Sequence, residues 1–181
     1  MSHIIGLSGS LRRHSVNSGL LRAAAEAMPE GSTLEIGSIA EIPLYNGDVE
    51  AAEFPAAVSA LKDRIAGADG LLLVTPEYNN GIPGIFKNAI DWLSRPNSDA
   101  ARVFGGKPVA VIGASPGGFG TILSQAAWLP VLRTLGADHW SGGRLMVSQA
   151  GQVFDAEGNL IDEKVRERLR AFLAGFVGYV G

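Results

Sequence analysis

The chain has 181 residues, of which 46% are hydrophobic, so it is long enough to bury a core, and we expect one domain over residues 1–181. Its net charge of −3 offers no basic face for phosphates, so we expect no nucleic-acid partner. Cysteine is absent, which excludes disulfides, thiolate nucleophiles and cysteine-ligated metal and suits a reducing compartment. The sequence contains no secretory signal pattern and no apolar run of membrane-spanning length. We therefore expect a cytoplasmic protein with no membrane association.

Five short apolar runs predict five β-strands. They are His3–Leu7, Thr33–Ile36, Gly70–Val74, Val109–Ala114 and Gly143–Val147. Several are apolar almost throughout, as is typical of parallel strands that helices cover on both faces. We therefore expect a mostly parallel sheet.

Segments with helical periodicity separate the predicted strands. Three of them show apolar stripes, formed by Leu20, Leu21, Ala24 and Met28, by Val58, Leu61 and Ile65, and by Phe86, Ala89, Ile90 and Leu93. Two further helices are predicted over Thr121–Leu135 and Asp162–Tyr179, and Pro130 should kink the first of these. The alternation of strands and helices predicts a three-layer, doubly wound α/β domain.

The loop after the first predicted strand, Ser8–Asn17, is rich in hydroxyl groups and leads into a helix. A helix N-terminus with Ser and Asn donors and a nearby arginine, Arg12, is suited to bind a phosphate. The loop lacks both the Walker pattern and Gly-x-Gly-x-x-Gly, which favours a monophosphate. Alternatively, Ser15 or Asn17 only caps the helix and the arginines are solvated.

The loop after the third predicted strand, Thr75–Gly84, combines one aromatic residue with several polar ones. Tyr78 offers a flat surface, and Glu77 and Asn79 offer polar edges, which suits a planar heteroaromatic ring. The alternative is an ordinary strand-to-helix turn in which Tyr78 is a half-buried surface residue.

The loop after the fourth predicted strand, Ala114–Gly120, contains three glycines and the hydroxyl of Ser115. The glycines allow close approach of the backbone to a ligand, or they serve only turns with positive φ. Because the carboxyl ends of parallel strands meet at one sheet edge, we expect these three loops to form one ligand site.

Together these segments resemble the NADPH-dependent FMN reductase family, the flavodoxin-like group that includes bacterial chromate and quinone reductases. The motifs that carry the resemblance are Gly9–Arg12 with Ser15 and Asn17, Pro76–Asn79 with Pro83–Gly84, Lys87–Trp92, and Ser115 with Gly117 and Gly118. The segment Val153–Asp162 also resembles that family's tail. The resemblance covers nearly the whole chain and implies a flavodoxin-like, five-stranded parallel sheet of order 2-1-3-4-5.

The resemblance also implies that FMN is the cofactor and assigns its binding residues. Ser10, Arg12, Ser15 and Asn17 would hold the phosphate, Pro76, Glu77, Tyr78 and Asn79 would line the isoalloxazine, and Ser115, Gly117 and Gly118 would lie at its pyrimidine end. Because the chemistry belongs to the flavin, we assign no catalytic residue. We expect no metal site, since His3, His14 and His139 are scattered along the chain.

The implied function is an FMN-dependent NAD(P)H oxidoreductase. It would pass a hydride from NADPH or NADH through bound FMN to a quinone, a flavin, an azo compound or a metal oxyanion such as chromate. Two alternatives are a flavodoxin-type electron carrier and a non-catalytic flavin-binding regulator. A carrier usually presents a strongly acidic face, which 18 acidic against 15 basic residues do not indicate.

The resemblance further implies a homodimer and allows a tetramer. Trp92, on the helix that follows the Tyr78 loop, is one candidate for apolar interface area. Core packing is the alternative for Trp92, as for Trp128 and Trp140. The segment Ala126–Pro130 lacks the polar residues that make tetramer contacts in the family.

Overall fold

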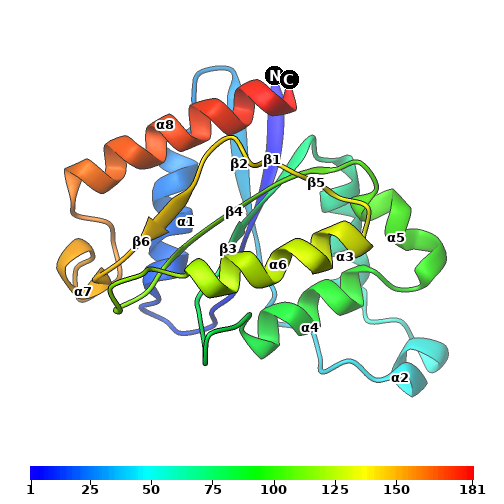
Figure 1. Cartoon of the computed structure of the whole chain (residues 1–181). Coiled ribbons are helices and arrows are strands. Elements are labelled where there is room, and N and C mark those ends of the chain that lie inside the picture. Colours follow the sequence, from blue (N-terminus) through cyan, green and yellow to red (C-terminus); the bar gives the residue numbers. More distant parts are fainter.

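The computed structural model describes residues 1–181 and shows one parallel sheet between two layers of helices (Figure 1). The strands are β1 (Ser2–Ser8), β2 (Ser32–Gly37), β3 (Gly70–Val74), β4 (Pro108–Ala114), β5 (Asp138–His139) and β6 (Leu145–Val147). Their order is β2-β1-β3-β4-β5, and β6 also pairs with β4. All pairings are parallel, which confirms the flavodoxin-like order 2-1-3-4-5.

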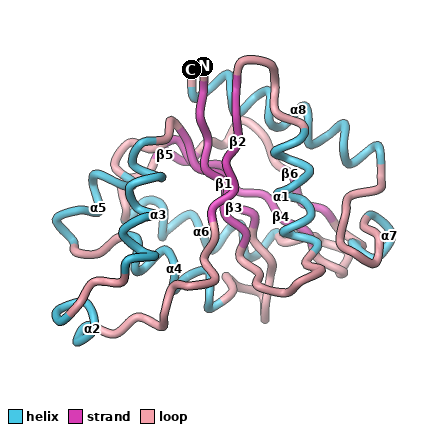
Figure 2. Tube along the Cα trace, turned by 180° about the vertical axis from the view of Figure 1, so that it is seen from behind, coloured by secondary structure: helices cyan, strands magenta, loops and turns pink.

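Eight helices connect and cover the strands. They are α1 (Val16–Glu26), α2 (Gly47–Ala52), α3 (Ala56–Gly67), α4 (Gly84–Leu93), α5 (Asn97–Phe104), α6 (Ile122–Thr134), α7 (Ala150–Val153) and α8 (Glu163–Val180). Figure 2 shows α1 and α8 on one side of the sheet and α3, α4 and α6 on the other. No helix combines the length and apolar character needed to cross a bilayer.

Alternate residues of the central strands supply one apolar core on each face of the sheet. Ile4 and Leu72 belong to the core beneath α1 and α8, whereas Ile5 and Leu71 belong to the core beneath α3, α4 and α6. This alternation follows from the two-residue period of a strand. Both faces of the sheet are therefore buried under helices, as the continuous apolar runs predicted.

The fifth strand position differs from the prediction, because two short segments fill it. β5 pairs with the start of β4, at Pro108 and Val109, and β6 pairs with the end of β4, from Ile112 to Ala114. Between β5 and β6 the chain has no ladder pairing with β4. There Trp140 packs into the core, and the distance between its ring centroid and that of Phe172 is 4.9 Å. The predicted strand Gly143–Val147 therefore begins two residues later, at Leu145.

All three tryptophans are buried, so the core-packing alternative holds and Trp92 supplies no interface area. Its side chain is fully buried, and its Nε1 donates to the carbonyl of Pro43 at 2.9 Å. Helix α6 runs on through Pro130, whose missing N–H leaves the carbonyl of Ala126 without its helical partner.

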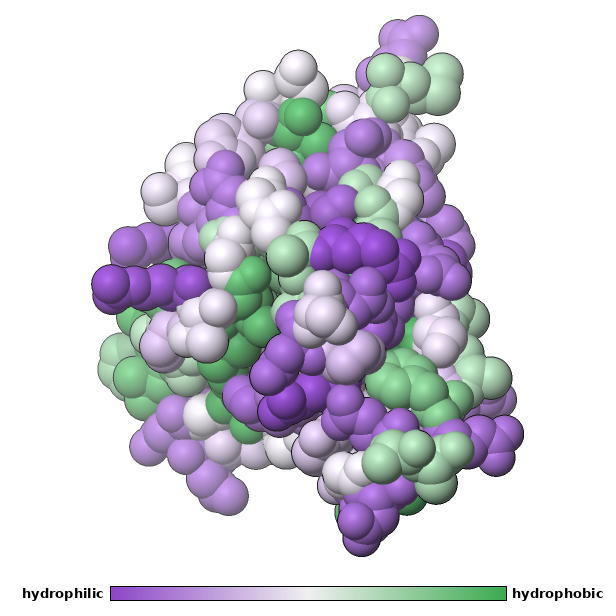
Figure 3. Space-filling model, turned by 90° about the vertical axis from the view of Figure 1, so that its right-hand side faces the viewer, coloured by the Kyte–Doolittle hydropathy of each residue, from purple (hydrophilic) through white to green (hydrophobic).

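The molecular face seen in Figure 3, on the side where α2 and α5 lie, is a mosaic of polar residues with smaller apolar areas between them. Leu44, beside α2, is 82% exposed, and α2 has no buried residue. Helix α2 itself therefore adds nothing to either core, whereas Ile39 and Ile42, which precede it, belong to the core beneath α3, α4 and α6.

Helix α1 packs against a tight turn, Asp155–Leu160, near the C-terminal end of the chain. The backbone N–H of Asn159 donates to Asp155 Oδ1 at 2.7 Å and holds the pKa of that carboxyl below its usual value. A Cβ added to Gly19 would lie 1.6 Å from the carbonyl oxygen of Gly158. Only glycine at position 19 permits this approach.

Gly19→Ala is therefore expected to lower the free energy of unfolding by about 1–3 kcal/mol, because the helix and the turn must separate. Urea denaturation measures the loss. Gly178→Ala, in α8, is the matched control, since a Cβ there meets nothing within 4 Å. Equal stability of the two variants would mean that the turn moves aside at no cost.

Candidate functional site

The loops that follow β1, β3 and β4 meet at the carboxyl edge of the sheet, the lower edge in Figure 1. They enclose a cavity of about 400 Å³. Eight of the eleven predicted site residues line it: Ser10, Arg12, Ser15, Asn17, Pro76, Glu77, Tyr78 and Ser115. The other three, Asn79, Gly117 and Gly118, belong to the same loops but lie outside the lining. The three loops therefore meet around one cavity, as expected from the sequence, and the assignment of these residues to a ligand stays a prediction.

A larger cavity of about 760 Å³ lies between α4, α5 and the C-terminal half of α6. None of its lining residues belongs to the three loops that follow β1, β3 and β4. Open α/β sheets bind ligands at that edge, so the smaller cavity is the candidate site.

The first loop presents donors without protein partners. The backbone N–H groups of Ser10, Leu11, Arg13, His14 and Val16 make no hydrogen bond within the chain. The hydroxyl oxygen of Ser10 accepts from the N–H of Arg12 at 3.3 Å, and the Arg12 side chain is exposed at the cavity. Free N–H groups beside a guanidinium suit a phosphate.

Two of the predicted phosphate ligands also hold the loop itself. Ser15 caps α1, since its Oγ accepts from the N–H groups of Asn17 and Ser18 at 3.2 and 3.3 Å. The Asn17 amide bonds to the backbone of Ala114 twice, donating from Nδ2 at 2.9 Å and accepting at Oδ1 at 2.8 Å. The capping alternative thus holds for Ser15, and Asn17 ties the first loop to the third.

The second loop contains a two-residue turn at Tyr78–Gly81. The N–H groups of Tyr78 and Gly81 each donate to the other residue's carbonyl, at 3.1 and 3.0 Å, and Asn79 and Asn80 have φ of 50° and 62°. Paired positive φ values define a type I′ turn, which asparagine tolerates. Asn79 thus shapes the turn, and Tyr78, 53% exposed, offers its ring beside the cavity.

Glu77 points its carboxylate at helix α6. One oxygen, Oε2, accepts from the N–H groups of Leu123 and Ser124 at 2.8 and 3.0 Å. The carboxylate therefore satisfies two N–H groups of the first turn of that helix, where a negative charge is favourable.

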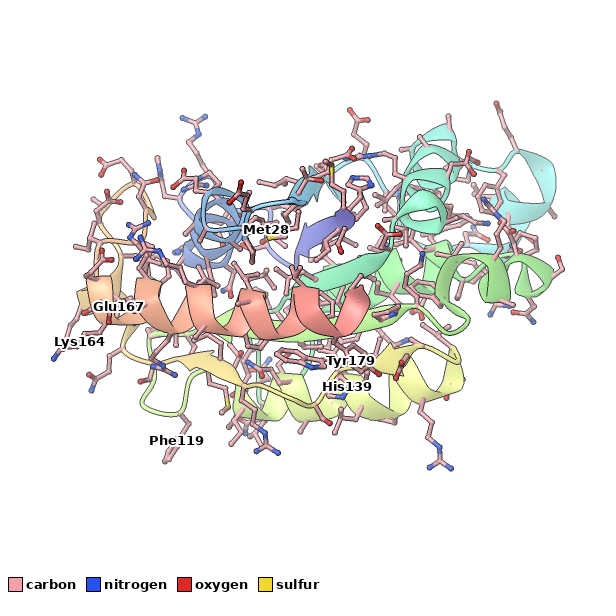
Figure 4. The ribbon with its side chains drawn as sticks, turned by 90° about the horizontal axis from the view of Figure 1, so that it is seen from above. Met28, Phe119, His139, Lys164, Glu167 and Tyr179 are labelled. Carbon is pink, nitrogen blue, oxygen red and sulfur yellow. The ribbon has the colours of Figure 1, made fainter.

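The third loop is anchored at its base and open at its tip. Ser115 Oγ donates to the carbonyl of Gly120 at 2.5 Å, and the N–H of Gln149 donates to the carbonyl of Gly117 at 2.9 Å. The N–H groups of Gly117 and Gly118 have no protein partner. At the tip, Phe119 is 83% exposed and points away from the ribbon (Figure 4).

The short helix α7 supplies a wall that the sequence analysis missed. Ala150 and Gly151 line the cavity, directly after Gln149, whose φ of 51° is left-handed. A glutamine in this conformation has no local sequence signal, so the turn that brings α7 to the site could not be read from the residues.

The unpartnered N–H groups of Ser10 and Val16 and the exposed Tyr78 ring, all from residues that line the cavity, fit a ligand with a phosphate and a planar ring. Fold and site together define a flavodoxin-like α/β protein with a mononucleotide-type site at the sheet edge. A sequence profile of the NADPH-dependent FMN reductases matches residues 2–152, and the chain belongs to this family. It is an FMN-dependent NAD(P)H oxidoreductase, which confirms the predicted enzyme class and cofactor.

Individual proteins of known sequence or structure agree with this assignment. An NAD(P)H-dependent FMN reductase of Pseudomonas aeruginosa is 44% identical over 167 residues, which are 92% of this chain and 89% of that protein. A 2-hydroxy-1,4-benzoquinone reductase of a Burkholderia species is 39% identical over 172 residues, 95% of this chain and 92% of the relative. The solved structure of FerB, a flavoenzyme NAD(P)H:(acceptor) oxidoreductase of Paracoccus denitrificans, superposes with a TM-score of 0.88 at 35% identity and covers 99% of this chain and 97% of its own.

Proposed function

We propose that this chain is a quinone reductase that binds FMN in the three-loop cavity and uses NADPH or NADH as the electron donor. The observation that carries the proposal is the cavity, whose lining includes Arg12, the residues Ser10 and Val16 with unpartnered backbone N–H groups, and an exposed aromatic residue, Tyr78. Bound FMN would supply the two-electron chemistry that links NAD(P)H to the acceptor. The chain supplies binding, orientation and electrostatics.

The residues divide between the two ends of the cofactor. The free N–H groups of the first loop, with Ser10, Arg12 and Ser15, would hold the phosphate, while Asn17 keeps that loop in place. Pro76 and Tyr78 would lie along the ring, and the third loop would lie at its pyrimidine end.

The third loop has donors to offer at that end. The N–H groups of Gly117 and Gly118 are free, and such donors stabilise negative charge where it develops on reduction. No side chain is required to move a proton in the hydride step itself.

A quinone is the acceptor class that the observations favour. One relative is named for a benzoquinone and others are named quinone reductases, and the aromatic face of Tyr78 is open to a planar ring. Free flavin, azo compounds and chromate stay predictions, as does the cytoplasmic location.

Anaerobic reconstitution tests the proposal. Purified protein loaded with FMN is expected to lose its visible flavin absorbance when NADPH or NADH is added and to regain it when a benzoquinone follows. Comparing the two nucleotides at equal concentration determines the preferred donor. Bound FMN that neither nucleotide bleaches would instead support the electron carrier or the regulator.

We also propose a homodimer formed through the outer face of α6. Ile122, Leu123 and Leu129 are each more than 40% exposed there, and Phe119 precedes the helix. Exposed apolar side chains gathered on one helix are typical of a subunit contact.

Leu129→Glu is expected to shift the protein from dimer to monomer, because it places a charge in the apolar contact. Sedimentation velocity measures the change, and Lys164→Glu, on the exposed face of α8, is the control. A dimer that survives Leu129→Glu would place the interface elsewhere.

A further inference from the structure

Two sets of side-chain contacts hold the loop after β3 to helix α6. We propose that Thr75 and Glu77 are positioning residues, which act through α6 to set the place of Pro76 and Tyr78 beside the flavin ring. The inference rests on the proposed site for FMN. Glu77 lines the cavity, whereas Thr75 and its partners on α6, Ser124 and Trp128, lie beyond that lining.

The first contact is the carboxylate of Glu77. Its Oε2 accepts from two successive N–H groups of α6, those of Leu123 and Ser124, at 2.8 and 3.0 Å. A carboxylate held by two N–H groups at a helix N-terminus is fixed in direction. Glu77 is therefore directed toward α6, and the next residue along the chain is Tyr78.

The second contact is the hydroxyl of Thr75, which is fully buried. Its Oγ1 donates to the carbonyl of Pro76 at 2.9 Å, lies 2.8 Å from Ser124 Oγ, and accepts from Trp128 Nε1 at 3.2 Å. A hydroxyl offers one donor and two acceptor sites, so these three partners use its full capacity. Ser124 and Trp128 are fully buried as well.

The two contacts converge on one stripe of α6. Ser124 bonds to Glu77 through its backbone and to Thr75 through its side chain, and Trp128 lies one turn further along. Because Pro76 and Tyr78 line the cavity and are adjacent to these anchors, their position is set by α6.

The Thr75 contact provides a matched pair of variants. Thr75→Val keeps the shape but removes the hydroxyl, which leaves the Trp128 N–H and the Ser124 hydroxyl without their partner. Thr75→Ser restores the hydroxyl. We expect Thr75→Val to raise the FMN dissociation constant about tenfold, equivalent to about 1.4 kcal/mol, and Thr75→Ser to stay within about twofold.

The Glu77 contact has its own control. Glu77→Ala is expected to raise the FMN dissociation constant about tenfold as well and to shift the visible absorbance band of the bound flavin. Asp162→Ala removes a comparable cap elsewhere, since Asp162 Oδ1 accepts from the N–H of Val165 at 2.8 Å at the start of α8. That variant should bind FMN like the wild type and leave its spectrum unchanged.

A double-mutant cycle with Tyr78→Ala separates positioning from direct contact. If Glu77 acts by placing the Tyr78 ring, adding Glu77→Ala to Tyr78→Ala should cost less than about twofold further. Full additivity would overturn the positioning of Tyr78 by Glu77, because it would mean that Glu77 affects FMN binding independently of that ring.

The result also distinguishes this inference from the proposed function. A wild-type protein that fails to bind FMN would reject the site as a whole. If the wild type binds FMN, and Glu77→Ala and Thr75→Val bind it with the same affinity, only the positioning role would be rejected. If Thr75→Val does not fold, the Glu77 cycle decides the question alone.

Discussion

Replacing Asn17 with alanine is expected to lower the free energy of unfolding by about 2–4 kcal/mol. The side chain is 3% exposed, and its amide bonds twice to the backbone of Ala114, at 2.9 and 2.8 Å. Removing the amide leaves a buried N–H and a buried carbonyl without partners, at a cost of about 1–3 kcal/mol each. The same change frees the first loop from the third, so FMN binding should weaken too.

Urea denaturation of the apoprotein measures this loss, and Ser15→Ala provides the comparison. Ser15 Oγ caps α1 through two N–H groups, and losing such a cap typically costs about 1 kcal/mol. Asn17→Asp keeps the shape but places an oxygen against the carbonyl of Ala114, so it should resemble Asn17→Ala. Equal losses for Ser15→Ala and Asn17→Ala would show that the link between the loops carries no stability of its own.

Most of the fold was readable from the sequence because its main elements are long and periodic. The predicted helix Thr121–Leu135 is observed over Ile122–Thr134, and the predicted Asp162–Tyr179 over Glu163–Val180. Asp162 caps the latter with its side chain, a signal that the residue type itself carries. Long amphipathic segments with such caps have few alternative structures.

The elements that were missed are short or lack a pattern. β5 has two residues, α7 has four and α2 has six, too few for a clear periodicity, and the eight-residue helix α5 was not predicted either. The break between β5 and β6 depends on where the Trp140 ring packs, against Phe172 and Phe176, and no local feature of the sequence reports such a distant contact.

The meeting of the three loops was predictable from the sequence, but the bonds that each side chain makes were less so. The strand ends fixed where the loops meet, because parallel strands of an open sheet finish at one edge. Glu77 and Asn17, however, carry groups that bond to a ligand or to the chain's own backbone equally well. Their bonds to α6 and to Ala114 depend on the tertiary structure, which brings together residues far apart in sequence.

The largest effect on cofactor binding is expected when Ser10 and Arg12 are both replaced by alanine. The double variant should weaken FMN binding by about 2–4 kcal/mol, roughly 30- to 1,000-fold, if each side chain makes a charge-assisted bond to the phosphate. Both side chains line the cavity, and Arg12 belongs to the loop that carries the free N–H groups. Fluorescence titration of the apoprotein with FMN gives the affinity.

Riboflavin identifies the end of the cofactor that these residues bind, because it has the same ring but no phosphate. Its affinity should be the same for the wild type and for Ser10→Ala/Arg12→Ala, whereas Tyr78→Ala should weaken both ligands. Arg13→Ala, an exposed neighbour outside the cavity lining, is the control for a general loss of positive charge. If Arg13→Ala weakened FMN as much as the double variant does, the first loop would attract the phosphate by its overall charge, and the cavity residues would have no specific part in holding it.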